Sequence, residues 1–217
     1  MSLNFFKKGF EVLRNGRVSR ALLSFQWDGY LKEVGWIDSY RQRRPVDKNN
    51  EPLPWLTYGF IEFVSPRLDR SMILIEYGSG NSTLFYSHKV KKVYAVEHDA
   101  VWYQRILRKI PGNVNLSHVE LGENGNYASF ATKLPEKGDV IIIDGRDRVN
   151  CIRKCQEALS DKGVIVLDDS ERSDYKQGIN LLLERNFKRL DFWGIAPGIL
   201  NRKCTTVFYR TVNCLDI

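Results

Sequence analysis

Short apolar runs alternate with segments of helical periodicity over most of the chain. Five runs have the length of a strand: Met72–Ile75, Val93–Val96, Val114–Val119, Val140–Ile143 and Val164–Leu167. Runs this short and this rich in Val and Ile are typical of buried strands. Helical patterns follow most of them, at Asn81–His88, Ala100–Ile110, Val149–Leu159 and Tyr175–Arg185. Strands separated by helix-length segments predict a parallel sheet with helices on both faces.

The C-terminal part has a different pattern. Phe187–Trp193 and Thr205–Tyr209 are strand-like and are joined by the Gly194–Cys204 loop, with no helix between them. Such a connection suits antiparallel neighbours. We therefore expect an α/β fold, with a seven-stranded, mostly parallel sheet, helices on both faces and a C-terminal antiparallel hairpin.

The first fifty residues are predicted to be a helical extension. Apolar residues recur at the spacing i, i+4, i+7, first at Phe6, Phe10 and Leu13 and then at Val18, Leu22 and Phe25. A polar stretch from Arg41 to Pro54 is expected to connect this extension to the rest. The interpretation is an extension over residues 1–50 and one domain over residues 51–217.

The positive charge is concentrated in that extension. Residues 1–50 hold ten Lys and Arg against five acids, a net charge of +5, and the whole chain of 217 residues carries +7. Such a balance suits nucleic acid, an anionic membrane surface or an anionic substrate. Because no RNA-binding motif with interleaved aromatic residues accompanies it, a solvated helix face is the favoured interpretation and nucleic acid is not.

Length, apolar content and cysteine usage predict a soluble protein with one core. No apolar run approaches the roughly 18 residues of a membrane span, and no signal peptide is visible, so a cytoplasmic location is expected. The cysteines have neither CxxC nor zinc-site spacing and are expected to be reduced, packed thiols. Composition leaves the oligomeric state open.

The stretch from Glu76 to Thr83 carries the clearest chemistry. A buried strand ends in an acid, and Gly78 and Gly80 follow, where the missing Cβ atoms let a ligand approach the backbone. The Glu76 carboxylate would repel a pyrophosphate and attract an ammonium group. This favours S-adenosylmethionine (SAM) over NAD, and a dinucleotide fingerprint would also need glycine where Thr83 stands.

A second strand ends in an acid at a matching distance. Glu97 lies 19 residues after Gly78, close to the separation of about 20 at which an acid meets a ribose in such folds. Its carboxylate could accept hydrogen bonds from both ribose hydroxyls.

The fourth and fifth strands end in acids and arginines, at Asp144 and Arg146 and at Asp169 and Arg172. Ligands of open α/β sheets bind beyond these strand ends. The arginines suit an anionic acceptor, and salt bridges to the same aspartates are the alternative.

Glu76-x-Gly78-x-Gly80-x-Ser82 resembles the SAM motif of class I SAM-dependent methyltransferases, with Ser82 in place of the third glycine. A wider resemblance, over residues 52 to 210, is to a poorly characterised bacterial branch of that superfamily. It is carried by Pro54-Trp55-x-Thr57-Tyr58, Val96-Glu97-His98-Asp99 and Ile143-Asp144-Gly145-Arg146-x-Arg148. The resemblance implies SAM binding by Trp55, Thr57, Tyr58, Glu76, Gly78, Ser79, Gly80, Asn81, Ser82, Glu97, His98 and Asp144. It places Trp55, Thr57 and Tyr58 near the methionine end of SAM.

The same resemblance implies catalysis at Asp144, Arg146 and Asp169. In a metal-dependent branch, acids after strands four and five hold Mg²⁺, and Asp144, Asp169 and Ser170 stand in comparable places. Gly145-Arg146 after the acid, and Ser170 in place of asparagine, argue against the metal here. Without it, Asp144 or Asp169 could act as a general base.

The expected function is SAM-dependent methylation of a hydroxyl on a small molecule or a sugar. The alternatives are an RNA methyltransferase, a nicotinamide-binding enzyme and a non-catalytic SAM- or nucleotide-binding protein. The Asn-Pro-Pro-Tyr-like signature of base-amine methylation is absent.

Overall fold

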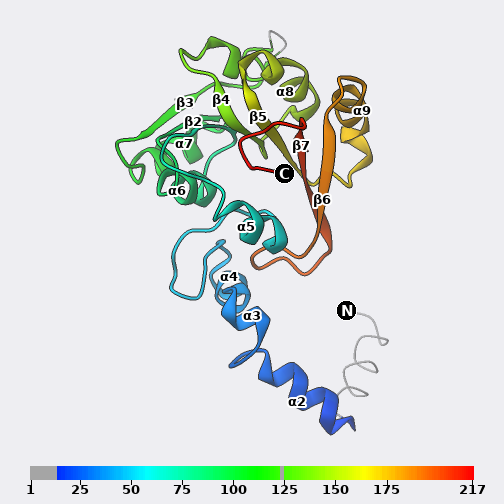
Figure 1. Cartoon of the computed structure of the whole chain (residues 1–217). Helices are drawn as coiled ribbons and strands as arrows, with labels where there is room; N and C mark the ends of the chain where they lie inside the picture. Colours follow the sequence, from blue (N-terminus) through cyan, green and yellow to red (C-terminus); the bar gives the residue numbers. More distant parts are fainter. Residues whose placement is uncertain (1–13, 123–124) are drawn as a thin grey trace.

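The computed structural model of the chain describes residues 14–122 and 125–217. The predicted helical residues Phe6, Phe10 and Leu13 lie outside these ranges. Seven strands are present: β1 (Ile73–Tyr77), β2 (Lys92–Glu97), β3 (Val114–His118), β4 (Gly138–Ile143), β5 (Leu159–Asp168), β6 (Lys188–Gly194) and β7 (Lys203–Tyr209). They form one sheet in the order β3-β2-β1-β4-β5-β7-β6 (Figure 1).

The strand directions confirm the predicted fold. β1 to β5 run parallel to their neighbours, whereas β7 is antiparallel to both β5 and β6. The chain order reverses between β1 and β4, and in open parallel sheets a ligand crevice forms beyond the carboxyl ends of the strands at such a point.

The described helices are α2 (Gly16–Ser24), α3 (Tyr30–Glu33), α4 (Trp36–Gln42), α5 (Tyr58–Val64), α6 (Asn81–Ser87), α7 (Ala100–Leu107), α8 (Arg148–Cys155) and α9 (Lys176–Glu184). Short 3₁₀ turns lie at Ala131–Lys133, Gln156–Ala158 and Ser173–Tyr175. No helix among the described residues is long and apolar enough to cross a membrane.

Alternate strand residues enter two separate cores, one on each face of the sheet. Leu74 packs with Phe60 of α5 on one face, and Ile75 packs with Ile152 of α8 on the other. Burial of successive strand residues explains why these runs are continuously apolar rather than alternating. Helices therefore cover both faces, as predicted.

One strand begins earlier than its sequence pattern indicates. The apolar run predicts a strand at Val164–Leu167, whereas β5 extends from Leu159 to Asp168. Its first part contains Asp161 and Lys162, whose side chains are exposed and carry no apolar signal. A polar strand end of this kind cannot be recognised from hydrophobicity alone.

Much of the N-terminal region contacts the predicted domain. Trp36 and Val46 are buried, and the Trp36 indole Nε1 donates a hydrogen bond to the Ile199 carbonyl at 3.0 Å. In contrast, α2 buries no side chain. The division at residue 50 stays a prediction, but α4 and the connector pack against the sheet domain.

Candidate active site

The turn after β1 has a backbone conformation that suits glycine. Gly78 has φ +105°, and a Cβ on it would lie 3.3 Å from the Gly145 backbone. Its N–H donates to the Val96 carbonyl at 2.9 Å, and the Gly80 N–H donates to Thr83 Oγ1 at 3.0 Å where α6 begins. The predicted glycine turn therefore brings the ends of β1, β2 and β4 close together.

Glu76 is a buried carboxylate at the end of β1. Its side chain is 1% exposed, and it accepts a hydrogen bond from Thr83 Oγ1 at 2.6 Å and another from Ser82. Burial raises the pKa of Glu76 to about 7, against the hydrogen bonds, and the Glu97 charge adds to the increase. No cationic side chain of the described residues pairs with it. An unpaired buried carboxyl group of this kind can be stabilised in its ionised form by a nearby positive charge.

Glu97 lies at the end of β2, and its carboxylate is fixed by three hydrogen bonds. Ser79 Oγ donates to Oε2 at 2.8 Å, and the backbone N–H groups of His98 and Asp99 donate to Oε1 at 2.8 and 3.0 Å. His98 Nδ1 lies 2.9 Å from Oε1, without hydrogen-bond geometry. The carboxylate is thus held in one orientation at the edge of the sheet.

Glu76 and Glu97 line a common cavity of about 1010 Å³. This volume suits a ligand of cofactor size. Most of the predicted site residues line it: Trp55, Glu76, Gly78, Ser79, Gly80, Asn81, Ser82, Glu97, His98, Asp144, Arg146 and Asp169. The ends of β1, β2, β4 and β5 therefore meet at this cavity.

Thr57 and Tyr58 do not line the cavity. The Thr57 N–H donates to Thr205 Oγ1, and its hydroxyl donates to the Phe192 carbonyl, both at 3.1 Å. Tyr58 is buried and packs edge-on against Tyr30. These two residues join the chain before α5 to the sheet and to α3. Their position near the methionine end of SAM stays a prediction.

Beyond β4 and β5, the cavity wall is a network of buried charges. Arg148 is 8% exposed. Its guanidinium donates to the Asp144 carboxylate and carbonyl, both at 3.0 Å, and lies 3.4 Å from the Asp169 carboxylate. It also donates to the backbone carbonyls of Gly145 and Asp168. One arginine thereby holds together the turns that follow both strands.

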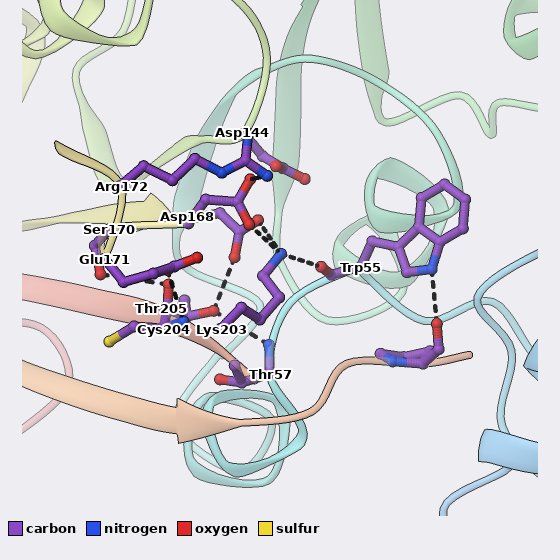
Figure 2. A network of polar contacts seen from close by, with 12 residues as sticks. Trp55, Thr57, Asp144, Asp168, Ser170, Glu171, Arg172, Lys203, Cys204 and Thr205 are labelled. Atoms are coloured by element: carbon purple, nitrogen blue, oxygen red, sulfur yellow. Dashed lines mark hydrogen bonds and ion pairs between the residues drawn. The ribbon is translucent and has the colours of Figure 1, made fainter. Parts of the chain in front are cut away.

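Lys203 of β7 completes the network from the hairpin (Figure 2). Its ammonium pairs with the carboxylate of Asp168 and, at 2.9 Å, with that of Asp169. It also donates to the Trp55 carbonyl at 3.1 Å. Burial opposes the charge, but Asp168 and Asp169 outweigh it and raise the pKa of Lys203. The lysine remains charged at the centre of the network.

The carboxyl groups of the network differ in environment. Burial raises the pKa of Asp144, against the effect of Arg148 and Lys203. Burial and the Asp144 charge raise the pKa of Asp168 well above its usual range. Asp169, with φ +51°, pairs with Arg172 at 2.7 Å as well as with Arg148 and Lys203. Asp144 has a side chain that is 24% exposed, against 10% for Asp169.

The residues compared above with a magnesium site do not form a ligand set. Asp144 and Asp169 are paired with Arg148 and Lys203. The Ser170 hydroxyl lies 2.6 Å from Thr206 Oγ1, in the sheet. Within residues 14–122 and 125–217, no group of three or more His, Cys, Asp or Glu side chains could hold a metal ion.

The cavity rim is basic. Exposed cationic side chains surround it: Arg43, Arg44, Arg105, Lys109, Arg146, Arg172 and Arg202. Arg172 forms the salt bridge to Asp169 that the sequence offered as an alternative. Arg146 forms no ion pair with any residue that the structure describes.

Three residues of the network were not predicted as site residues, namely Arg148, Asp168 and Lys203. Asp168 directly precedes Asp169, so the strand end could have indicated it. Arg148 stands within the motif after β4 that carries the family resemblance. Lys203 has no sequence signal, because its position depends on the antiparallel register that pairs Asp168 with Thr205.

Several solved structures have a fold similar to that of this chain. Precorrin-6y C5,15-methyltransferase from Geobacter metallireducens GS-15 aligns with a TM-score of 0.55 and 14% identity, over 70% of this chain and 86% of that chain. An rRNA methylase from Streptococcus thermophilus aligns with a TM-score of 0.51 and 18% identity, over 70% of this chain and 94% of that chain. Spermidine synthase from Thermotoga maritima aligns with a TM-score of 0.53 and 16% identity, over 70% of this chain and 56% of that chain.

The fold is that of the class I SAM-dependent methyltransferases, which confirms the resemblance at the level of architecture. No family model matches the sequence, and no curated protein sequence matches it either. The similar structures differ in the substrates that their names give, so the fold by itself does not identify a substrate.

We predict that Lys203→Met destabilises the protein by about 3–5 kcal/mol, because two carboxylates lose their buried partner. Asp168 already has a raised pKa in the folded state, and loss of the ammonium raises it further. The native state then binds more protons than the unfolded state, so stability returns as the pH falls. Urea unfolding at about pH 8 and about pH 5.5 should show a smaller deficit at the lower pH.

Lys188→Met, at an exposed position of β6, is the matched control and should change stability by less than about 0.5 kcal/mol. An equal deficit for Lys203→Met at both pH values would contradict the charge network as its cause.

Proposed function

We propose that the protein is a SAM-dependent methyltransferase that methylates a hydroxyl group on an anionic small molecule or sugar. The observation that carries the proposal is the position of two buried carboxyl groups, those of Glu76 and Glu97. They lie on either side of one glycine turn and line the same cavity. Neither has an Arg or Lys partner among the described residues, whereas the buried Asp168 and Asp169 and the neighbouring Asp144 do.

Two carboxyl groups in the cavity support SAM as the ligand, one for each of its polar ends. The Glu97 carboxylate, fixed by Ser79 and two backbone N–H groups, would accept the ribose hydroxyls. The buried Glu76 would attract the cationic amino-acid end, and ionisation of its carboxyl, with a pKa of about 7, becomes easier beside a positive charge. The chemistry that SAM supplies when bound is an electrophilic methyl group on a sulfonium.

Asp144 is the better placed of the two candidate bases. Its carboxyl group is more exposed to the cavity than that of Asp169, and its pKa is raised. A raised pKa brings a carboxylate closer to the optimum for proton transfer at neutral pH. Asp169 forms ion pairs with Arg148, Arg172 and Lys203, so we assign it a structural role in the cavity wall.

The rim supports a negatively charged acceptor. Arg146 follows Asp144 at the end of β4, and Arg202 precedes Lys203 at the start of β7, so both stand beside the charge network. A guanidinium without an acidic partner is a forked donor for a phosphate or a carboxylate. Such an anchor would hold the acceptor while Asp144 accepts its hydroxyl proton, and positioning then supplies most of the catalysis.

An RNA acceptor is the second candidate, supported by the same basic rim and by the fold shared with a structure named as an rRNA methylase. In that case Arg43, Arg44 and the charges of the N-terminal region would contact backbone phosphates.

We predict that SAM and S-adenosylhomocysteine raise the melting temperature in proportion to RT ln(1 + [L]/Kd), and that NAD does not. Glu97→Gln should weaken SAM binding about 10-fold or more, because an amide cannot accept both ribose hydroxyls as a charged group does. The measurement is a thermal-shift titration of each variant.

Glu157→Ala, at an exposed position away from the cavity, serves as the control and should bind SAM like the unmodified protein. If neither SAM nor S-adenosylhomocysteine stabilises the protein, the proposed cofactor is wrong. Stabilisation by NAD alone would support a nicotinamide enzyme instead.

We predict that Asp144→Asn lowers methyl transfer by about 10²–10⁴-fold, the usual contribution of a general base, with SAM binding retained. In the unmodified enzyme, kcat/KM should rise with pH as Asp144 loses its proton. The assay is transfer of labelled methyl from SAM to a panel of hydroxyl compounds that carry phosphate or carboxylate groups.

Asp174→Asn, at an exposed position near the end of β5, is the matched control and should retain full activity. A loss of less than about threefold for Asp144→Asn would rule it out as the base. SAM binding with no transfer to any hydroxyl or RNA acceptor would favour a non-catalytic SAM-binding protein.

Salt dependence separates the two acceptor classes. An RNA acceptor held by several phosphate contacts should lose more than about tenfold in affinity between about 50 and 200 mM salt. We expect no such binding, and fluorescence anisotropy with short RNA oligomers tests it. Tight, salt-sensitive RNA binding that Arg146→Ala weakens, with Lys188→Ala as control, would instead support the RNA methyltransferase.

A further inference from the structure

Helix α2 extends away from the sheet domain and buries none of its side chains (Figure 1). It is joined to the domain through α3, whose Tyr30 hydroxyl donates to Glu62 Oε1 at 3.1 Å and whose ring packs edge-on against Tyr58. The helix has a defined start, since the Asn15 side chain accepts from the N–H groups of Arg17 and Val18 at 3.2 Å. It is therefore a formed helix that contributes no packing to the core.

The two sides of α2 differ in chemistry. Val18, Leu22 and Phe25 recur at i, i+4, i+7 and share one side, and their exposed fractions are 39%, 49% and 40%. With about 3.6 residues per turn, Arg20 lies on the opposite side, with the 51% exposed Leu23 beside it, and Arg17 lies at the border between the two sides. Just after the helix, Trp27 is 72% exposed. Large apolar residues this accessible, beside basic ones, are characteristic of helices that lie in a membrane interface.

The charge of this segment has one sign. From Arg14 to Trp27 there are three arginines and no acid, and the first acid that follows is Asp28. Over residues 1–27 the sequence has five Lys or Arg and the single acid Glu11. A basic segment with exposed Phe, Leu and Trp is complementary to an anionic lipid surface both in charge and in apolar character.

We propose that α2 is an interfacial membrane helix that docks the domain on a bilayer containing anionic lipid. Val18, Leu22, Phe25 and Trp27 would enter the boundary between headgroups and acyl chains, and Arg17 and Arg20 would contact lipid phosphates. A second copy of this chain fits less well, because pairing of the apolar sides alone would leave the basic side without an anionic partner. RNA fits less well because it would leave the apolar side in water.

The test is flotation of the full chain with vesicles of phosphatidylglycerol and phosphatidylcholine, compared with pure phosphatidylcholine. We expect binding only to the anionic vesicles and weaker binding at high salt. Leu22→Glu, and separately the pair Arg17→Glu and Arg20→Glu, should each lower the partition coefficient by at least about tenfold. Leu183→Glu, at a 40% exposed apolar position on α9, is the matched control and should bind like the unmodified protein.

None of the α2 variants should alter thermal stability or the SAM-induced thermal shift, so failure here is distinguishable from failure of the proposed function. Equal binding to both vesicle types, or no binding to either, would overturn the proposal. It would also be overturned if Leu22→Glu converted a dimer to a monomer in light scattering without affecting flotation. RNA binding that the arginine pair abolishes and Leu22→Glu spares, in a protein that does not float, would identify nucleic acid as the partner instead.

Discussion

The geometry of the site depends on the buried ionic network around Lys203 and Arg148. Three carboxyl groups stand at the ends of β4 and β5, and the two cations between them come from different parts of the chain, α8 and β7. Removing charges from water is costly unless each meets a partner. Because each charge must meet its partner, the network fixes how the hairpin lies against the parallel strands. The Lys203 hydrogen bond to the Trp55 carbonyl also fixes the position of Trp55 at the cavity.

This network divides the cavity into two electrostatic halves. At the ends of β1 and β2, Glu76 and Glu97 are supported by hydroxyl and N–H donors rather than by cations. At the ends of β4 and β5, Asp144, Asp168 and Asp169 each pair with Arg or Lys, and further arginines surround the opening. A cationic ligand group is favoured in the first half and an anionic one in the second. This is the arrangement that a positively charged methyl donor and a negatively charged acceptor would require.

The local features of the fold and site could be predicted from the sequence, and the long-range ones could not. Apolar runs indicated the strands because buried parallel strands have few polar residues, and the acids that end them could be located by spacing alone. Lys203 could not be found in this way, since it reaches Asp168 only through the register of β7 on β5. Thr57 stands within a family-like motif, yet its hydroxyl is used to join α5 to the Phe192 carbonyl.

Glu76 is the residue whose burial is hardest to explain by folding alone. Its pKa of about 7 lies above the ordinary carboxyl value, so the folded protein holds a proton there that the unfolded chain releases. Raising the pH towards 7 then lowers stability, since the native state binds more protons than the unfolded state. A cationic ligand group beside Glu76 reverses this effect by favouring the ionised form. The buried carboxyl group thus costs stability by itself, and under the proposed function it would contribute binding free energy to a cationic ligand group.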